Sequence, residues 1–174
     1  MSEAADRWHE CAGAFALRLG AVGDDQWEGA TPCDAWTVRQ LVDHAVGTQV
    51  RFGGLLGLRS ESVDWPGVCE SMTELLSGEG VLDGTVNVGP LGEMSKIQVL
   101  DVCTNDLLIH TWDLARAIGY SEALPVDAVS SCYQWLQDLP VELVRSAGRY
   151  VDAVSVDADA DLQTKMLAFA GRKP

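Results

Sequence analysis

The stretch DLLIHTWDLARA, residues 106–117, combines a helical apolar pattern with three side chains that can bind a proton or a metal ion. Asp106, His110 and Asp113 lie four and three residues apart, a spacing that places them on one face of an α-helix. The leucines of the same stretch must be buried, and a carboxylate removed from water without a partner is costly. The sequence therefore predicts that a hydrogen-bonded group or a cation neutralises Asp106.

Two interpretations of this polar layer are open at this point. In the first, Asp106 pairs with His110 and no ion is involved. In the second, the Asp-x-x-x-His spacing projects an oxygen and a nitrogen toward one metal ion, and His44, at the edge of an earlier helix's apolar stripe, is the third ligand. Three such ligands with an open fourth position are typical of catalytic zinc. The predicted metal ligands are His44, Asp106 and His110, and the predicted ion is zinc, with nickel and iron as alternatives.

The other polar residues near this layer are predicted to have structural roles. Asp113 is expected to pair with Arg116 on the surface, and a hydrogen bond that fixes the tautomer of His110 is the alternative. His9 lies off the apolar stripe of the first predicted helix and is expected to be exposed. Arg39 is expected to form a surface ion pair.

One cysteine and two tryptophans flank the predicted ligands in the sequence. Cys33 precedes a helix N-terminus, where a thiolate would be stabilised, but a packed structural cysteine is the expectation. Trp36 and Trp112 are expected to belong to the core rather than to the wall of a pocket.

Helical periodicity recurs along most of the chain and supplies the elements that must position the ligands. The predicted elements are helices over residues 2–22, 37–58, 67–76, 96–118, 125–139 and 162–170, and one short strand over 85–88. Ser2 is the predicted N-cap of the first helix. Thr37 and Gln40 have the form of a capping box, and Gly119 ends the longest helix. These elements predict an all-α, antiparallel four-helix bundle with short additional C-terminal elements, in a single domain over residues 1–174.

Composition restricts the partners that the protein can have. The chain has 26 acidic residues and only 12 Lys and Arg, which gives a net charge of −14. This negative charge argues against binding to nucleic acid or to an anionic membrane. No run of apolar residues approaches the ~20 that a membrane-spanning helix needs. The five cysteines are scattered without a CxxC pair, which fits a reducing cytoplasm better than a disulfide framework. We expect a cytoplasmic protein with a small-molecule substrate, and a homodimer is left open.

Four stretches together resemble one known family. TPCDAWTVRQLVDHAVG (31–47), PLGEM (90–94), DLLIHTWDLARAIG (106–119) and DADADLQTKMLAFAGRKP (157–174) resemble the actinobacterial metal-binding proteins of the DinB and mycothiol-dependent maleylpyruvate isomerase N-terminal superfamily. The resemblance implies a four-helix bundle with one divalent metal, usually zinc. A histidine on the second helix and an acid-x-x-x-His pair on the fourth hold this metal in the family. Those positions correspond to His44, Asp106 and His110.

The resemblance also implies a function. In this family a low-molecular-weight thiol, mycothiol, binds the open position of the metal, and metal coordination favours the nucleophilic thiolate. We therefore expect a metal-dependent enzyme of the thiol S-transferase type that acts on an electrophilic small molecule. One alternative is a thiol-independent, metal-assisted isomerase, cyclase or hydrolase. The other is a non-catalytic protein that binds a metal or a small molecule.

Two departures from the characterised isomerase predict that maleylpyruvate is not the substrate. The isomerase type has Glu where this chain has Asp106, and it carries an additional C-terminal domain for which a chain ending at Pro174 has no room. We expect no useful turnover in a steady-state assay with maleylpyruvate, mycothiol and metal. A kcat on the order of 1 s⁻¹ or more would contradict this expectation.

Overall fold

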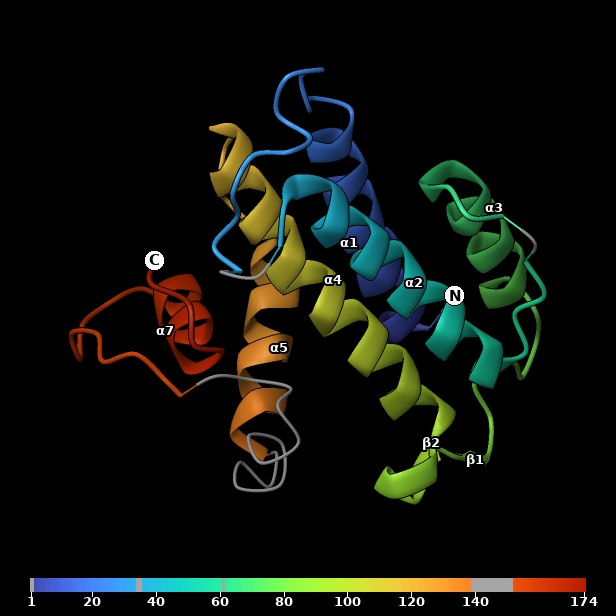
Figure 1. Ribbon diagram of the computed structural model, residues 1–174. Coiled ribbons are helices and arrows are strands. Elements are labelled where there is room, and N and C mark those ends of the chain that lie inside the picture. The colour runs from blue at the N-terminus through green and yellow to red at the C-terminus, as the bar shows by residue number, and fades with distance from the viewer. Residues whose placement is uncertain (1, 34–35, 61, 139–151) are drawn as a thin grey trace.

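The structure, a computed structural model, describes residues 2–33, 36–60, 62–138 and 152–174 (Figure 1). It is mostly helical. The helices are α1 (Glu3–Leu19), α2 (Val38–Leu56), α3 (Trp65–Leu76), α4 (Lys96–Ile118), α5 (Val126–Asp138) and α7 (Leu162–Phe169). The remaining elements are the strands β1 (Thr85–Asn87) and β2 (Glu93–Ser95) and the short 3₁₀ helix η1 (Gly89–Leu91) between them.

The helix ends follow the capping signals of the sequence. The Ser2 hydroxyl accepts the Ala5 amide at 3.3 Å at the start of α1. Thr37 and Gln40 form the predicted capping box of α2. Gly119 closes α4 with a φ of 69°, in the left-handed region that favours glycine. The predicted end of the fifth helix, at residue 139, lies outside the described residues.

The segment before α4 differs from the prediction of a single short strand. β1 and β2 form an antiparallel hairpin in which Thr85 pairs with Ser95. Gly89 and Gly92 have φ angles of 63° and 74°, and these positive values let the chain reverse between β1 and β2. Ser95 then makes a capping box with Gln98, so the hairpin leads directly into α4. The fold is thus mostly helical with one small hairpin, which is compatible with the predicted all-α class.

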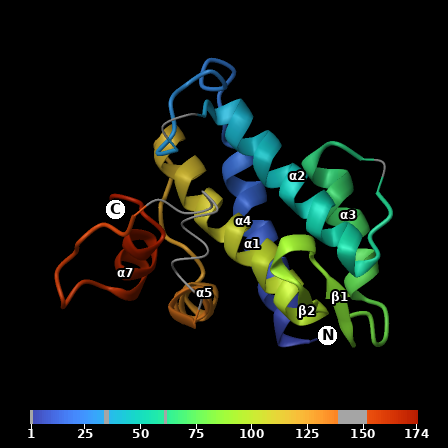
Figure 2. The same cartoon turned by 60° about the horizontal axis from the view of Figure 1, so that its bottom comes forward.

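Helix α4 is the central element of the core. It packs against both α1 and α2, and the views in Figures 1 and 2 show the three helices side by side, with α2 running opposite to the other two. One buried amide joins all three helices. The indole nitrogen of Trp8 donates to Oε1 of Gln49 at 2.9 Å, and Nε2 of Gln49 donates to the Cys103 carbonyl at 3.1 Å. This contact fixes α2 against α4, the two helices that carry the predicted ligands.

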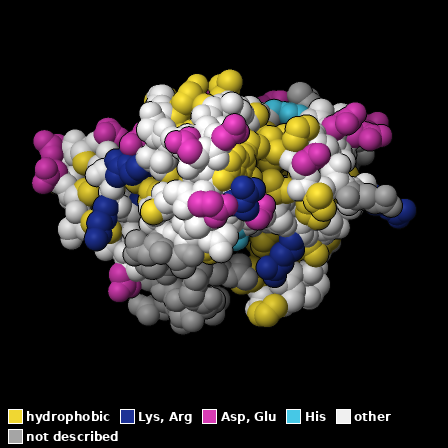
Figure 3. Space-filling model, turned by 45° about the horizontal axis from the view of Figure 1, so that its top comes forward, with side chains coloured by type: hydrophobic (Ala, Val, Ile, Leu, Met, Phe, Trp, Pro, Cys, Tyr) yellow, Lys and Arg dark blue, Asp and Glu magenta, His cyan; other side chains and the backbone are white. Residues whose placement is uncertain are grey.

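The remaining helices cover the outside of this core. α3 packs on α2 and α1, while α5 packs on α4 and α1 and carries α7 on its other side (Figure 1). Among the described residues, no helix is both long enough and apolar enough to cross a membrane. On the face shown in Figure 3, the basic side chains stand among acidic and hydrophobic ones and form no continuous patch.

Candidate metal centre

The three predicted ligands lie together between α2 and α4. Nε2 of His44, from α2, is 3.6 Å from Oδ1 of Asp106 on α4. Nε2 of His110, one turn further along α4, is also 3.6 Å from Oδ1 of Asp106. One ligand atom from each residue lies within 4.8 Å of the others. The helical spacing on α4 and the packing of α2 against it therefore bring two nitrogens to one carboxylate.

These distances test whether the three residues fit a metal ion. A separation of 3.6 Å is too long for a good hydrogen bond. It is close to the roughly 3.3 Å that separates two ligands of a tetrahedral zinc with bonds of about 2.0–2.1 Å. The second oxygen of Asp106, Oδ2, is buried and has no hydrogen-bond partner among the described residues. The nitrogen and oxygen donors and this unpartnered oxygen fit a divalent cation.

The electrostatics of the site also favour a positive charge. Burial alone would raise the pKa of Asp106, but the neighbouring His110 and His44 lower it. Burial alone would lower the pKa of His110, yet the charge of Asp106 and the hydrogen bond to Asp113 raise it to about 10. Without a metal, the two carboxylates on either side of His110 favour its protonated form. A divalent cation can take the place of the proton on Nε2, which faces Asp106, while Nδ1 keeps its proton toward Asp113.

A second carboxylate orients the ring of His110. Nδ1 of His110 lies 2.9 Å from Oδ2 of Asp113, which leaves Nε2 facing Asp106. The side chain of Asp113 is fully buried, and the contacts with His110 and with Arg172 outweigh burial and lower its pKa to about 2. A carboxylate on the outer nitrogen of a metal-bound histidine is a common arrangement, because it fixes the tautomer and the ring orientation.

The predicted pair between Asp113 and Arg116 is wrong. Arg116 instead binds Glu122 at 2.8 Å and lies over the ring of Trp112. Asp113 faces inward because it is three residues from His110 on the buried face of α4. The alternative, in which Asp113 orients His110, is the one that the structure shows.

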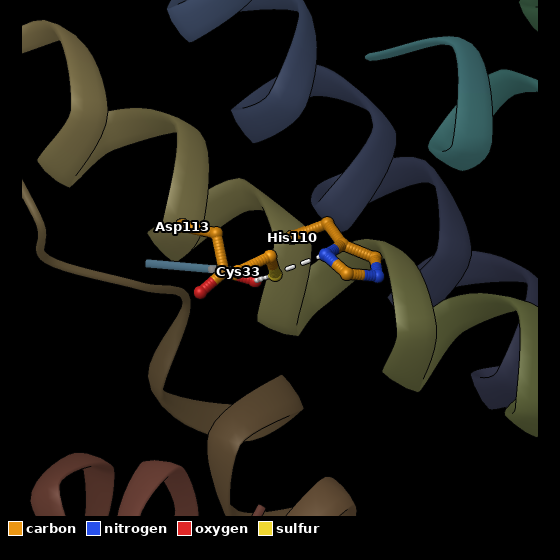
Figure 4. A group of neighbouring side chains, drawn as sticks. All are labelled: Cys33, His110 and Asp113. Carbon is orange, nitrogen blue, oxygen red and sulfur yellow. Dashed lines mark hydrogen bonds and ion pairs between the residues drawn. The ribbon is translucent and has the colours of Figure 1, made fainter. Parts of the chain in front are cut away.

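A second cluster shares His110 but does not fit a metal ion. Ligand atoms of Cys33, His110 and Asp113 also lie within 4.8 Å of one another. Figure 4 shows these three side chains grouped beside α4. However, Nη2 of Arg172 lies 2.7 Å from Oδ2 of Asp113 and 3.3 Å from Sγ of Cys33. A permanent guanidinium charge in contact with both the thiol and the carboxylate leaves no place for a second cation. His44, Asp106 and His110 are therefore the better metal ligands.

An aromatic ring covers part of the candidate centre. The ring of Trp36 lies 4.4 Å from that of His44 and 5.6 Å from that of His110, measured between centroids. Trp36 is half-buried and packs against the core as predicted, and its ring also forms a wall of the site. Trp112 is buried in the core, as expected.

Thr48 is a site residue that the sequence analysis did not single out. Its hydroxyl lies 3.4 Å from Nε2 of His44, and its nearness helps to lower the pKa of Asp106. Thr48 follows His44 by four residues on α2, and this spacing is the signal that could have identified it. Solvent reaches the site from this side, because the His44 side chain is 37% exposed and that of His110 only 8%.

Two further predictions concern residues outside the centre. Arg39 forms the expected surface ion pair, with Glu28 at 3.0 Å. His9 is half-buried instead of exposed, and its ring packs edge-on against Trp8 with a centroid distance of 5.1 Å. His9 belongs to neither group of metal-binding side chains found among the described residues.

Comparison with known proteins places the chain in a family. The family model of the mycothiol maleylpyruvate isomerase N-terminal domain matches residues 8–79. Uncharacterized proteins from two strains of Mycobacterium tuberculosis, CDC 1551 / Oshkosh and ATCC 25618 / H37Rv, are each 33% identical to this chain over 168 residues. The matched part covers 91% of this chain and 92% of each relative. The chain belongs to the mycothiol maleylpyruvate isomerase N-terminal domain family. No solved structure matches it.

Family membership confirms the resemblance that the sequence motifs indicated, including its actinobacterial character. The family is linked to mycothiol and to metal binding. The family match covers α1 from Trp8 onward together with all of α2 and α3, and therefore His44, but it ends before α4. Asp106 and His110 lie in the part of the chain that the M. tuberculosis relatives cover.

Proposed function

We propose that this protein is a metal-dependent enzyme in which mycothiol is the nucleophile that attacks an electrophilic small molecule. The family supports the link to mycothiol, and the donor set of His44, Asp106 and His110 supports the metal. The observation that carries the proposal is the buried Oδ2 of Asp106. It has no hydrogen-bond partner among the described residues, although two histidine nitrogens lie near the same carboxylate.

The proposal includes the architecture that holds the site. Helices α1, α2, α4 and α5 would form the antiparallel four-helix bundle of the family, with α7 as an addition, and residues 1–174 would form a single domain. In such bundles a metal lies between facing helices, as His44 on α2 and the pair on α4 do here.

Each side chain of the centre would have its own role in metal binding. His44, Asp106 and His110 would hold one divalent ion, zinc by the choice of ligands, with nickel or iron as alternatives. Asp113 would keep the proton of His110 on Nδ1, so that the lone pair of Nε2 faces the ion. A bound divalent metal would favour the thiolate form of a thiol at neutral pH.

The proposed reaction is a substitution at the electrophile. The thiol loses its proton to solvent on the exposed side of His44, and its sulfur forms a bond to an electrophilic carbon. The leaving group departs from that carbon with the bonding electron pair. Trp36 shields one face of the two histidine rings from water, so the thiol must approach from the open side.

Mycothiol binding tests this proposal directly. We expect isothermal titration calorimetry to show that zinc-loaded protein binds mycothiol and releases a proton, because thiolate is the metal-binding form. Metal-free protein prepared with a chelator should bind mycothiol only weakly. Equal binding to the two forms would contradict the proposal.

Solvent access to His44 favours one alternative, a thiol-independent isomerase, cyclase or hydrolase. The two functions differ in one measurable property. Turnover of a substrate that requires added mycothiol supports the first, and turnover that is independent of any thiol supports the alternative.

A further inference from the structure

The C-terminal segment reaches the candidate centre through one arginine. α7 ends in a left-handed turn in which Gly171 has a φ of 82°. The amide of Gly171 donates to the carbonyl of Ala168 at 3.0 Å, and that of Arg172 donates to Leu167 at 2.9 Å. This hydrogen-bond pattern is the Schellman motif, which ends a helix and turns the chain sharply. It places Arg172 where its side chain meets α4.

The guanidinium group of Arg172 holds both oxygens of Asp113. Nε lies 3.0 Å from Oδ1, and Nη2 lies 2.7 Å from Oδ2. Such a two-pronged contact fixes the plane of a carboxylate as well as its position. Oδ2 of Asp113 in turn lies 2.9 Å from Nδ1 of His110. The contacts therefore run from the C-terminal segment through Asp113 to a predicted metal ligand.

We propose that Arg172 is a positioning residue of the metal centre. It holds the Asp113 carboxylate in the orientation that directs Nε2 of His110 toward the ion. This inference rests on the proposed metal site. It concerns Arg172, a residue near the C-terminus that is 59 positions away from Asp113 in the sequence.

The geometry explains why another cation at this place would not be equivalent. The Arg172 side chain is 13% exposed and that of Asp113 is fully buried, so the pair is largely shielded from water and salt. Lysine would bring one ammonium charge to the carboxylate without fixing its plane. With alanine, Asp113 loses both contacts with the guanidinium group. The carboxylate and the ring of His110 can then turn together.

The test compares three variants by metal affinity. Arg172→Ala should weaken zinc binding by about 10- to 100-fold in competition with a chelator, the usual effect of removing an outer contact of a metal-bound histidine. Arg172→Lys should lie between this variant and the wild type. Arg116→Ala is the matched control, because Arg116 also contacts the C-terminal segment, at the Lys173 carbonyl, but not Asp113. Its zinc affinity should equal that of the wild type.

Two spectroscopic measurements separate positioning from a loss of stability. With cobalt in place of zinc, the visible absorption spectrum should change in Arg172→Ala and stay constant in Arg116→Ala, since it reports the geometry of the ligands. In metal-free protein, the proton NMR signal of the His110 Nδ1–H should broaden or disappear in Arg172→Ala only. Should Arg172→Ala fail to fold, as judged by circular dichroism, Arg172→Lys carries the same tests.

The possible failures can be told apart. Wild-type protein that binds neither zinc nor cobalt at the three ligands would overturn the proposed metal site itself. Wild-type binding together with an unchanged affinity and cobalt spectrum in both Arg172 variants would overturn the role of Arg172 alone. Equal losses in Arg172→Ala and Arg116→Ala would show that anchoring of the C-terminal segment, not the contact with Asp113, is responsible, and would also overturn it.

Discussion

Protein in which His44 and His110 are both replaced by alanine is expected to retain only a trace of the divalent metal that the wild type binds. The wild type should carry about one ion per chain when it is purified without a chelator. The double variant keeps only Asp106 of the three proposed ligands, and one carboxylate competes poorly with water for a divalent cation. Elemental analysis of the purified proteins measures the difference.

The third histidine provides the control for this experiment. His9→Ala also removes an imidazole, but His9 packs against Trp8 on α1 and lies in neither metal-binding group of the described residues. Its metal content should equal that of the wild type. His44→Ala alone adds a check on folding, because His44 is the more exposed ligand and its loss should disturb the metal-free fold least. Full metal content in the double variant would rule out the proposed ligands.

The sequence predicted that His44, Asp106 and His110 lie together, because local geometry determines most of this arrangement. A separation of four residues on a helix places Asp106 and His110 on one face regardless of how the helices pack. His44 required one further step, namely that the edge of the apolar stripe of α2 lies against α4. Capping residues such as Thr37 and Gly119 mark helix ends by local backbone chemistry, so these ends were predicted as well.

The surroundings of the site could not be predicted in the same way. The contact between Asp113 and Arg172 joins residues that are 59 positions apart and depends on the turn at Gly171. Arg116, only three residues from Asp113, was the better partner by sequence spacing, but its side chain lies over Trp112 and binds Glu122. Trp36 packs against the core as predicted, but an aromatic residue beside a helix start gives no sign that its ring also covers two histidines.

Metal binding is also expected to stabilise the fold strongly. A ligand that binds the native state alone raises the free energy of unfolding by RT ln(1 + [L]/Kd), which is about 4 kcal/mol at 1,000 times Kd. For a chain of this size, each kcal/mol raises Tm by about 2–4 °C, so the total increase is roughly 8–16 °C. The three proposed ligands come from two helices, so a bound ion would join these helices in the native state only. Thermal unfolding followed by circular dichroism, with zinc and then with excess chelator, measures the shift.

The double variant makes the stability experiment specific to the site. Without His44 and His110, zinc should leave Tm nearly unchanged, and His9→Ala should show the full increase. In metal-free protein, the loss of His110 also removes a partner from Asp106 and from Asp113, so the double variant should be less stable than the wild type even before zinc is added. The decisive quantity is therefore the change in Tm on adding zinc, taken separately for each protein. An equal increase in wild type and double variant would mean that zinc stabilises the fold from somewhere other than the His44, Asp106 and His110 centre.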